Sequence, residues 1–172
     1  MPAISPIRVF DYPSAEAFNA AAARAMAALG PEDFRERSHF IAGRFENLYL
    51  DPARIPGLEA LLDYALEQAA AQLERPLQQL RRGFWLNRMA PGQVTSRHAH
   101  AEHDELLSGV YYIQVPAHSG DLLFDDDPFE IRIRPRAGMG VLFDPELTHW
   151  VEEHRGAGER LSVAFNIGPV QE

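Results

Sequence analysis

Residues 107–143 read LSGVYYIQVPAHSGDLLFDDDPFEIRIRPRAGMGVLF. Short runs of aliphatic and aromatic residues alternate in this stretch with Gly, Pro and Asp, a pattern typical of short strands joined by tight turns. It predicts strands at 107–115, 121–124, 129–134 and 139–143. Around it, further strands are expected at 84–89, 94–98, 148–151 and 161–167. Eight short strands predict a mainly β fold, an all-β jelly roll or barrel.

Two helices are expected before these strands. The alanine-rich stretch 15–29 follows Ser14, which suits an N-cap, and it stops at Gly30 and Pro31. The second helix runs from about 56 to 74, where leucines and alanines recur at helical spacing. Residues 39–50 (HFIAGRFENLYL) fit either a short strand or a loop. We expect a single domain over 1–172, with 1–83 as mostly helical support packed outside and 84–172 as the β core that carries the site.

The composition narrows the possible chemistry. The chain has 172 residues, with 16 basic and 25 acidic side chains and a formal net charge of -9, which disfavours nucleic acid as a partner. Every basic residue is arginine and there is no cysteine, which excludes lysine Schiff bases, thiol nucleophiles and cysteine metal sites. No apolar run approaches the roughly 20 residues that span a bilayer. We expect a soluble cytoplasmic protein without a membrane partner, whose chemistry uses histidine, carboxylates, arginine, hydroxyls or a bound metal.

Histidines gather in the second half of the chain. His98 and His100 stand two apart, so on a strand they point the same way and can share one ion. Glu102 continues that side if the strand persists, and His149 begins another expected strand. Two close histidines and one distant histidine match a facial metal site with open positions. Exposed loop histidines are the alternative, and the spacing does not choose between zinc and other metals.

A second candidate is Arg160 on the last expected strand. Strand alternation places residues 160, 162, 164 and 166 on one face. An inward-facing arginine needs an anion to meet it, and the guanidinium of Arg160 with the hydroxyl of Ser162 can hold a carboxylate. A surface ion pair with Glu153 or Glu159 is the alternative.

Other polar residues fall into two groups. Asn87 and Tyr112 can add polar contacts to the same lumen, although each also suits a core polar group with its hydrogen bonds satisfied. His103, His118 and His154 are expected at the surface.

Taken together, markers within residues 85–167 resemble the iron(II)/2-oxoglutarate-dependent oxygenases, specifically a bacterial and phage group. The markers are WLN (85–87), PG (91–92), HAH (98–100), SGVYY (108–112), GDLLF (120–124), His149 and ERLSVAFN (159–166). The resemblance implies a double-stranded β-helix, which is a jelly-roll or cupin-like barrel. It also implies an enzyme that binds Fe(II) and converts 2-oxoglutarate to succinate and CO₂ while oxidising a substrate.

The resemblance also implies roles for individual residues. His98 and His149 would be the proximal and distal iron ligands. Arg160 would hold the distal carboxylate of 2-oxoglutarate with the help of Ser162. Asn87 and Tyr112 fall where relatives of this superfamily place contacts to the cosubstrate.

One departure from the family concerns the third ligand. The superfamily places a carboxylate two residues after the proximal histidine, and this chain has His100 there. Either the metal takes three imidazoles, or Glu102 or Asp104 supplies an oxygen ligand.

Two other functions remain open at this stage. One is a cupin-like three-histidine metalloenzyme that does not use 2-oxoglutarate, since residues 92–105 also resemble a first cupin motif. The other is a non-catalytic ligand-binding or sensor barrel. The expected substrate is a small molecule or an amino-acid side chain, and the sequence does not predict the oligomeric state.

Overall fold

The computed structural model describes residues 6–100 and 103–171. Its strands form two antiparallel sheets, ordered β1-β9-β6-β11-β4-β3-β2 and β5-β10-β7-β8. The large sheet contains β1 (Arg8–Asp11), β2 (Glu36–Ile41), β3 (Arg44–Tyr49), β4 (Leu80–Met89), β6 (Leu107–Gln114), β9 (Met139–Phe143) and β11 (Arg160–Pro169). The small sheet contains β5 (Thr95–His98), β7 (Leu122–Asp126), β8 (Phe129–Ile133) and β10 (Thr148–Val151). The expected mainly β, jelly-roll fold is confirmed.

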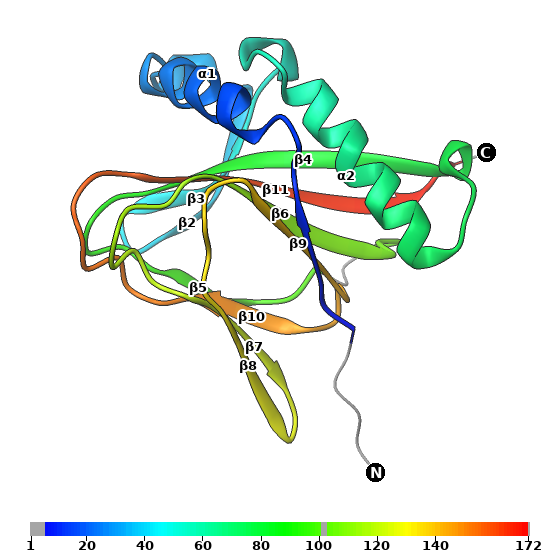
Figure 1. The fold of residues 1–172 in the computed structure, drawn as a ribbon. Coiled ribbons are helices and arrows are strands. Elements are labelled where there is room, and N and C mark those ends of the chain that lie inside the picture. Colours follow the sequence, from blue (N-terminus) through cyan, green and yellow to red (C-terminus); the bar gives the residue numbers. More distant parts are fainter. Residues whose placement is uncertain (1–5, 101–102, 172) are drawn as a thin grey trace.

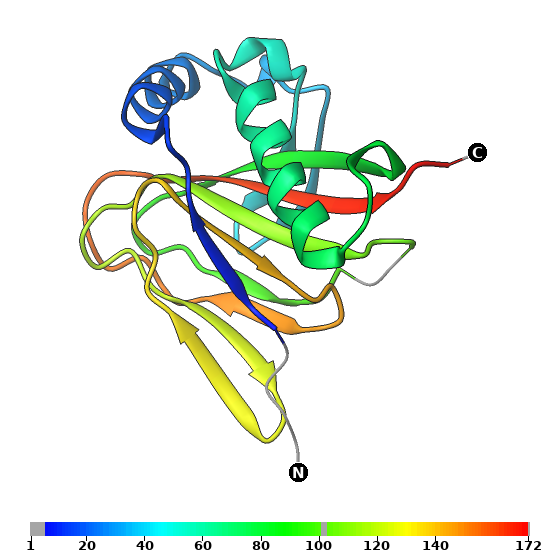
Figure 2. The same cartoon turned by 45° about the vertical axis from the view of Figure 1, so that its right-hand side comes forward.

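Two helices cover one face of the large sheet, and the small sheet lies on its other side (Figures 1 and 2). They are α1 (Ala15–Ala27) and α2 (Leu58–Leu73), and single 3₁₀ turns occupy Pro31–Asp33, Pro52–Arg54 and Leu77–Gln79. Each helix has an apolar stripe at helical spacing that is buried, including Phe18 and Met26 of α1 and Leu61 and Leu62 of α2. These side chains share one core with the outer face of the large sheet. The prediction of helices packed outside the barrel is therefore confirmed. No helix of the described residues is long and apolar enough to cross a membrane.

The two longest strands determine which side chains face the interior of the barrel. β4 and β11 have ten residues each and pair along their whole length, from Arg160 opposite Met89 to Pro169 opposite Leu80. Both strands extend beyond the expected ranges 84–89 and 161–167. Since side chains alternate across a strand, this register directs every second residue of both strands into the space between the sheets.

The segment before residue 84 contributes strands as well as helices. The stretch 39–50, which the sequence left undecided, lies in a hairpin of β2 and β3 at one edge of the large sheet. β1 adds a strand at the opposite edge, where Phe10 pairs with Gly140. A Cβ at Gly140 would come within 2.1 Å of the Phe10 ring, so this contact requires glycine. The hairpin matters for function because it reaches the cavity described below.

Candidate metal centre and anion-binding cavity

Three histidines meet in the space between the two sheets. His98 on β5 lies directly opposite His149 on β10, and His100 follows β5 by two residues. One ring nitrogen from each histidine lies within 4.8 Å of the others. The ring centroids of His98 and His149 are 4.2 Å apart, and that of His100 lies 4.9 Å from each. The structure thus brings together the three histidines that the spacing predicted.

Backbone carbonyls orient two of the three rings. The Nδ1 of His98 lies 2.6 Å from the carbonyl oxygen of Ser96, and the Nδ1 of His149 lies 3.1 Å from that of Leu147. A neutral imidazole that donates from Nδ1 keeps its lone pair on Nε2. Both Nε2 atoms are therefore available to a metal ion.

The third ring is held by packing and by its own backbone. The N–H of His100 donates to the carbonyl of Pro145 at 2.8 Å, and the ring lies 5.3 Å from that of Trp85 at an interplanar angle of 33°. Its Nε2 is 3.2 Å from the Nε2 of His149. These two nitrogens are close enough to bind the same metal ion.

Burial keeps two of these imidazoles neutral. Desolvation, reinforced by the neighbouring His98, lowers the pKa of His100 to about 4. The same causes lower the pKa of His149 to about 3, with His100 as a further contributor. Neutral imidazole is the form that binds metals, so neither nitrogen must lose a proton near pH 7. Three imidazoles on one side of an ion suit a divalent first-row transition metal with positions left open.

The carboxylates that were alternative ligands do not join this cluster in the described residues. Glu102 lies outside the residues that the structure describes. Asp104 accepts hydrogen bonds from Arg81 and, at 3.2 Å, from Gln171. The Arg81 hydrogen bond is the main cause that lowers the pKa of Asp104. Asp104 thus pairs with side chains outside the histidine cluster.

A cavity of about 460 Å³ contains the histidines and the polar residues that the sequence singled out. Ser162 on β11 lies opposite Asn87 on β4 and opposite Tyr112 on β6, so the three form a row across adjacent strands. Arg160 stands one inward position further along β11, and all four residues line the cavity. The alternation of the last strand therefore predicted its inner face correctly.

Arg160 is a buried cation that pairs with no carboxylate among the described residues. Arg160 is only 3% exposed. Its Nη1 donates to the carbonyl of Ser119 at 3.0 Å and to that of Gly120 at 2.6 Å. The guanidinium carbon lies 5.2 Å from the centroid of the Tyr112 ring. None of the ion pairs formed within residues 6–100 and 103–171 includes Arg160.

Burying the charge of the Arg160 guanidinium costs free energy. Burial lowers the pKa of Arg160, an effect that Tyr112 and Asp121 partly offset. Burial likewise raises the pKa of Tyr112, so its phenol keeps its proton. A guanidinium stays protonated in proteins, and an unpaired buried charge is expensive. An anionic ligand in the cavity would compensate it.

Asn87 has a second set of contacts that the sequence did not indicate. Its Oδ1 accepts from Arg44 at 3.2 Å, and its Nδ2 donates to the carbonyl of Glu46 at 2.7 Å. Both partners belong to the β2–β3 hairpin, and both are buried. Sequence reasoning missed Arg44 and Glu46 because the hairpin itself was undecided.

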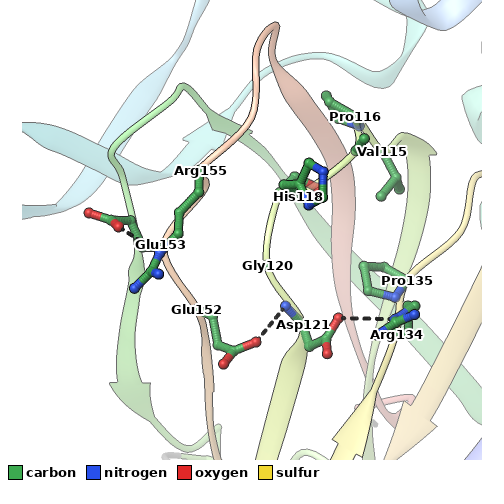
Figure 3. A pocket seen from close by; sticks show the side chains of 12 residues that line it. Val115, Pro116, His118, Gly120, Asp121, Arg134, Pro135, Glu152, Glu153 and Arg155 are labelled. Carbon is green, nitrogen blue, oxygen red and sulfur yellow. Dashed lines mark hydrogen bonds and ion pairs between the residues drawn. The ribbon is translucent and has the colours of Figure 1, made fainter.

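A second cavity, of about 720 Å³, has different chemistry (Figure 3). Its charged side chains pair with one another: Glu153 binds Arg155 at 3.0 Å, and Asp121 lies 3.9 Å from Arg134. Glu152 accepts from the backbone N–H of Asp121 at 3.1 Å. The histidine cluster that could hold a metal ion among the described residues lies in the cavity of about 460 Å³, which we take as the candidate functional site.

The remaining histidines divide between surface and interior. His103 and His118 are exposed, as expected. The surface prediction for His154 is wrong, because this residue is 1% exposed. Its Nε2 lies 2.8 Å from the carbonyl oxygen of Gly158, and its Nδ1 accepts from the N–H of Gly156 at 3.1 Å. Its polar atoms are satisfied within its own turn, which indicates a structural role.

Comparison with known proteins gives one family match. A family model described as "Putative 2OG-Fe(II) oxygenase" matches residues 83–131, which include His98, His100, Asn87 and Tyr112. A search of curated proteins finds no significant match.

Solved structures show the same fold. A Pseudomonas putida prolyl-4-hydroxylase is 20% identical with a TM-score of 0.71, over 97% of this chain and 89% of that chain. HygX from Streptomyces hygroscopicus, solved with nickel and 2-oxoglutarate bound, is 16% identical with a TM-score of 0.69, over 96% and 84%. A Trichoplax adhaerens prolyl hydroxylase, solved with a peptide fragment of the hypoxia inducible factor oxygen degradation domain, is 12% identical with a TM-score of 0.69, over 94% and 83%.

Proposed function

From its resemblance to the iron(II)/2-oxoglutarate-dependent oxygenase superfamily, which the family match and the shared fold confirm, we propose that this chain is an Fe(II)- and 2-oxoglutarate-dependent dioxygenase. Its substrate is a small molecule or an amino-acid side chain. The observation that carries this proposal is the position of Arg160. It is a buried cation that forms no ion pair among the described residues, and it lines the same cavity as three clustered histidines. The histidines suit a metal ion, and the arginine suits the carboxylate of a ligand that also reaches the metal.

The histidine residues have the first role in this proposal. His98, His100 and His149 would hold the iron(II) ion, and the lowered pKa values of His100 and His149 favour binding, because both imidazoles are neutral at pH 7. When bound, iron(II) with 2-oxoglutarate supplies the oxidation, in which substrate C–H, O₂ and 2-oxoglutarate become C–OH, succinate and CO₂. The protein contributes ligand positions and a fixed geometry for this chemistry.

The residues on the large sheet orient the cosubstrate. Arg160 is already fixed by the carbonyls of Ser119 and Gly120, so its guanidinium can receive a carboxylate without further ordering. The hydroxyl of Ser162 stands next to it on the same face of β11 and can donate one more hydrogen bond. Tyr112 forms the neighbouring wall and keeps its proton, so it too can donate.

The rest of the cavity wall includes apolar side chains. Trp85, Leu122 and Phe143 line it with apolar surface, and the ring of Phe143 lies 4.8 Å from that of His149. The volume of about 460 Å³ falls within the roughly 300–1,000 Å³ of small-molecule sites. The hairpin residues Ile41 and Tyr49 also line it, and we assign the substrate to this side. Relatives named as prolyl hydroxylases agree with an amino-acid side chain as one class of substrate.

An anaerobic titration tests the proposal. Metal-free protein receives Fe(II) and then 2-oxoglutarate, and the absorbance is followed for the visible metal-to-ligand charge-transfer band of a chelated keto acid. The His149→Ala variant is the blank. A band that requires both additions and is missing in the blank supports the proposal.

One observation favours a second function. No carboxylate joins the three histidines among the described residues, which is also the ligand set of a cupin-like metalloenzyme that does not use 2-oxoglutarate. The same titration separates the two functions. Iron binding with no response to 2-oxoglutarate would favour the cupin-like enzyme. If metal binds and no reaction ever consumes 2-oxoglutarate, a non-catalytic ligand-binding barrel is favoured.

A further inference from the structure

Glu46 is a buried carboxylate that the proposed reaction does not use. It is 4% exposed and lines the same cavity as the histidines. Both of its oxygens accept from Ser96, at 3.2 and 3.3 Å from the backbone N–H and at 2.8 and 3.3 Å from the hydroxyl. No ion pair within 4 Å among the described residues includes Glu46. Among the described residues, the hydrogen bonds of its carboxylate are thus all with one residue of β5, Ser96.

Ser96, the β5 residue that Glu46 contacts, also orients His98, one of the three proposed metal ligands. The carbonyl oxygen of Ser96 lies 2.6 Å from the Nδ1 of His98. Ser96 therefore stands between the carboxylate of Glu46 and the ring of His98, with its N–H and hydroxyl bound on one side and its carbonyl on the other. Hydrogen-bonding partners of this kind fix the ring orientation and the tautomer of metal-ligating histidines.

β5 needs such support because it is short and lies at the edge of its sheet. It has four residues and pairs only with β10, where the register shifts between His149 and Val151. An edge strand leaves N–H and C=O groups without a neighbouring strand. The side chain of Glu46 takes the place of that missing strand at Ser96.

A second side chain of the same hairpin holds the start of the same strand. The Nη2 of Arg44 donates to the carbonyl of Val94 at 2.9 Å and to the hydroxyl of Thr95 at 3.0 Å. Arg44 and Glu46 together therefore contact three consecutive residues, 94–96, directly before the RHAH segment. The hairpin that carries them is joined to β4 by a single register pair, Leu48 with Leu86. Arg44 also donates to Asn87 and to the carbonyl of Arg88 on β4, so this end of the hairpin contacts both β4 and the segment that leads into β5.

We propose that Glu46 is a positioning residue of the metal centre. It fixes Ser96 so that the carbonyl of Ser96 holds His98 with its Nε2 toward His100 and His149. The inference rests on the proposed function only in that these histidines bind a metal. Burying a carboxylate costs free energy, and here every hydrogen bond that offsets the cost goes to the residue that orients a ligand.

A Co(II) titration of the full-length, metal-free chain tests this inference. It gives the dissociation constant and the visible d–d spectrum for wild type, Glu46→Gln and Glu46→Ala, with an unfolding curve of each apoprotein. We expect Glu46→Ala to weaken Co(II) binding about 10-fold, the lower end of the range for partners that contact a ligating histidine directly, because Glu46 acts through Ser96. Glu46→Gln retains one acceptor oxygen, so its dissociation constant for Co(II) should lie between those of wild type and Glu46→Ala. At saturating Co(II), the spectrum of the alanine variant should also change.

The matched control is Glu36→Gln, an exposed carboxylate on the same hairpin. It should bind Co(II) like wild type. Equal affinities and spectra in wild type and both Glu46 variants would overturn the inference and leave the proposed function intact. An equal loss in Glu36→Gln would also overturn it, since the hairpin as a whole and not Glu46 would then be responsible. If Glu46→Ala does not fold, the glutamine variant decides. Wild type that binds no Co(II) would overturn the proposed function itself.

Discussion

Replacing Arg160 by alanine should weaken 2-oxoglutarate binding about 100-fold while metal binding stays unchanged. A guanidinium can hold a carboxylate through two hydrogen bonds, and bonds to charged groups contribute about 1.5–3 kcal/mol each. Taking the lower figure for both bonds gives about 3 kcal/mol, which is about a 100-fold change at 1.4 kcal/mol per tenfold. Arg160 is not part of the histidine cluster, so the metal ligands stay in place.

The same substitution also removes two hydrogen bonds within the fold. Arg160 donates to the carbonyls of Ser119 and Gly120, and at the same lower figure of about 1.5 kcal/mol each the two lost bonds cost about 3 kcal/mol. Removing a buried cation that forms no ion pair among the described residues offsets part of that cost. Arg160→Lys keeps the charge but loses the planar, two-point geometry, so its affinity should lie between those of wild type and alanine.

The assay is a titration of the iron-loaded protein with 2-oxoglutarate under anaerobic conditions, followed by the charge-transfer band. Iron affinity is measured separately for each variant. Unchanged 2-oxoglutarate affinity in Arg160→Ala would refute the assignment of this residue to the cosubstrate. A parallel loss of iron affinity would mean that the substitution disturbs the whole barrel, and the reasoning from separate subsites would then be wrong.

Three further substitutions give predictions. His100→Ala removes one of three ligands and should weaken metal binding by at least about 100-fold in a Co(II) titration; wild-type affinity would exclude His100 as a ligand. Ser162→Ala should weaken 2-oxoglutarate binding about tenfold, as expected for one hydrogen bond to a carboxylate, in the titration used for Arg160. Gly109→Ala would bring a Cβ within 2.3 Å of the Phe165 ring, and urea unfolding should show a loss of about 1–3 kcal/mol. Gly83→Ala meets nothing within 4 Å and serves as the control; equal losses in both would remove the steric explanation.

The parts of the site that could be predicted depend on local periodicity. The two-residue spacing of His98 and His100 and the alternation of Arg160 and Ser162 follow from strand geometry alone. The structure places these residues on one cavity, together with His149. The jelly-roll fold could also be predicted, from the short runs and turn residues of the second half, whereas strands β1 to β3 of the first half were not among the predicted strands.

Partners distant in sequence could not be predicted. The surface prediction for His154 is wrong because two hydrogen bonds within its turn satisfy a buried ring, and nothing in the residues around it distinguishes that turn from an exposed one. The contacts of Asn87 could not be predicted either, because its partners are distant in sequence. Its amide meets Arg44 and Glu46, which are more than 40 residues earlier in the chain.

The β2–β3 hairpin shows why charged residues make it hard to predict which face of a strand is buried near a candidate site. In β3, residues alternate between buried and half-buried, and the buried set begins with Arg44 and Glu46. A rule that places charged side chains outside would choose the opposite face, so the stretch 39–50 has no clear pattern of its own. Buried charged groups need hydrogen-bond partners, and here those partners belong to β4 and to residues 94–96. The hairpin is therefore specified by its contacts with β4 and with residues 94–96, and these distant contacts explain why its own sequence is ambiguous.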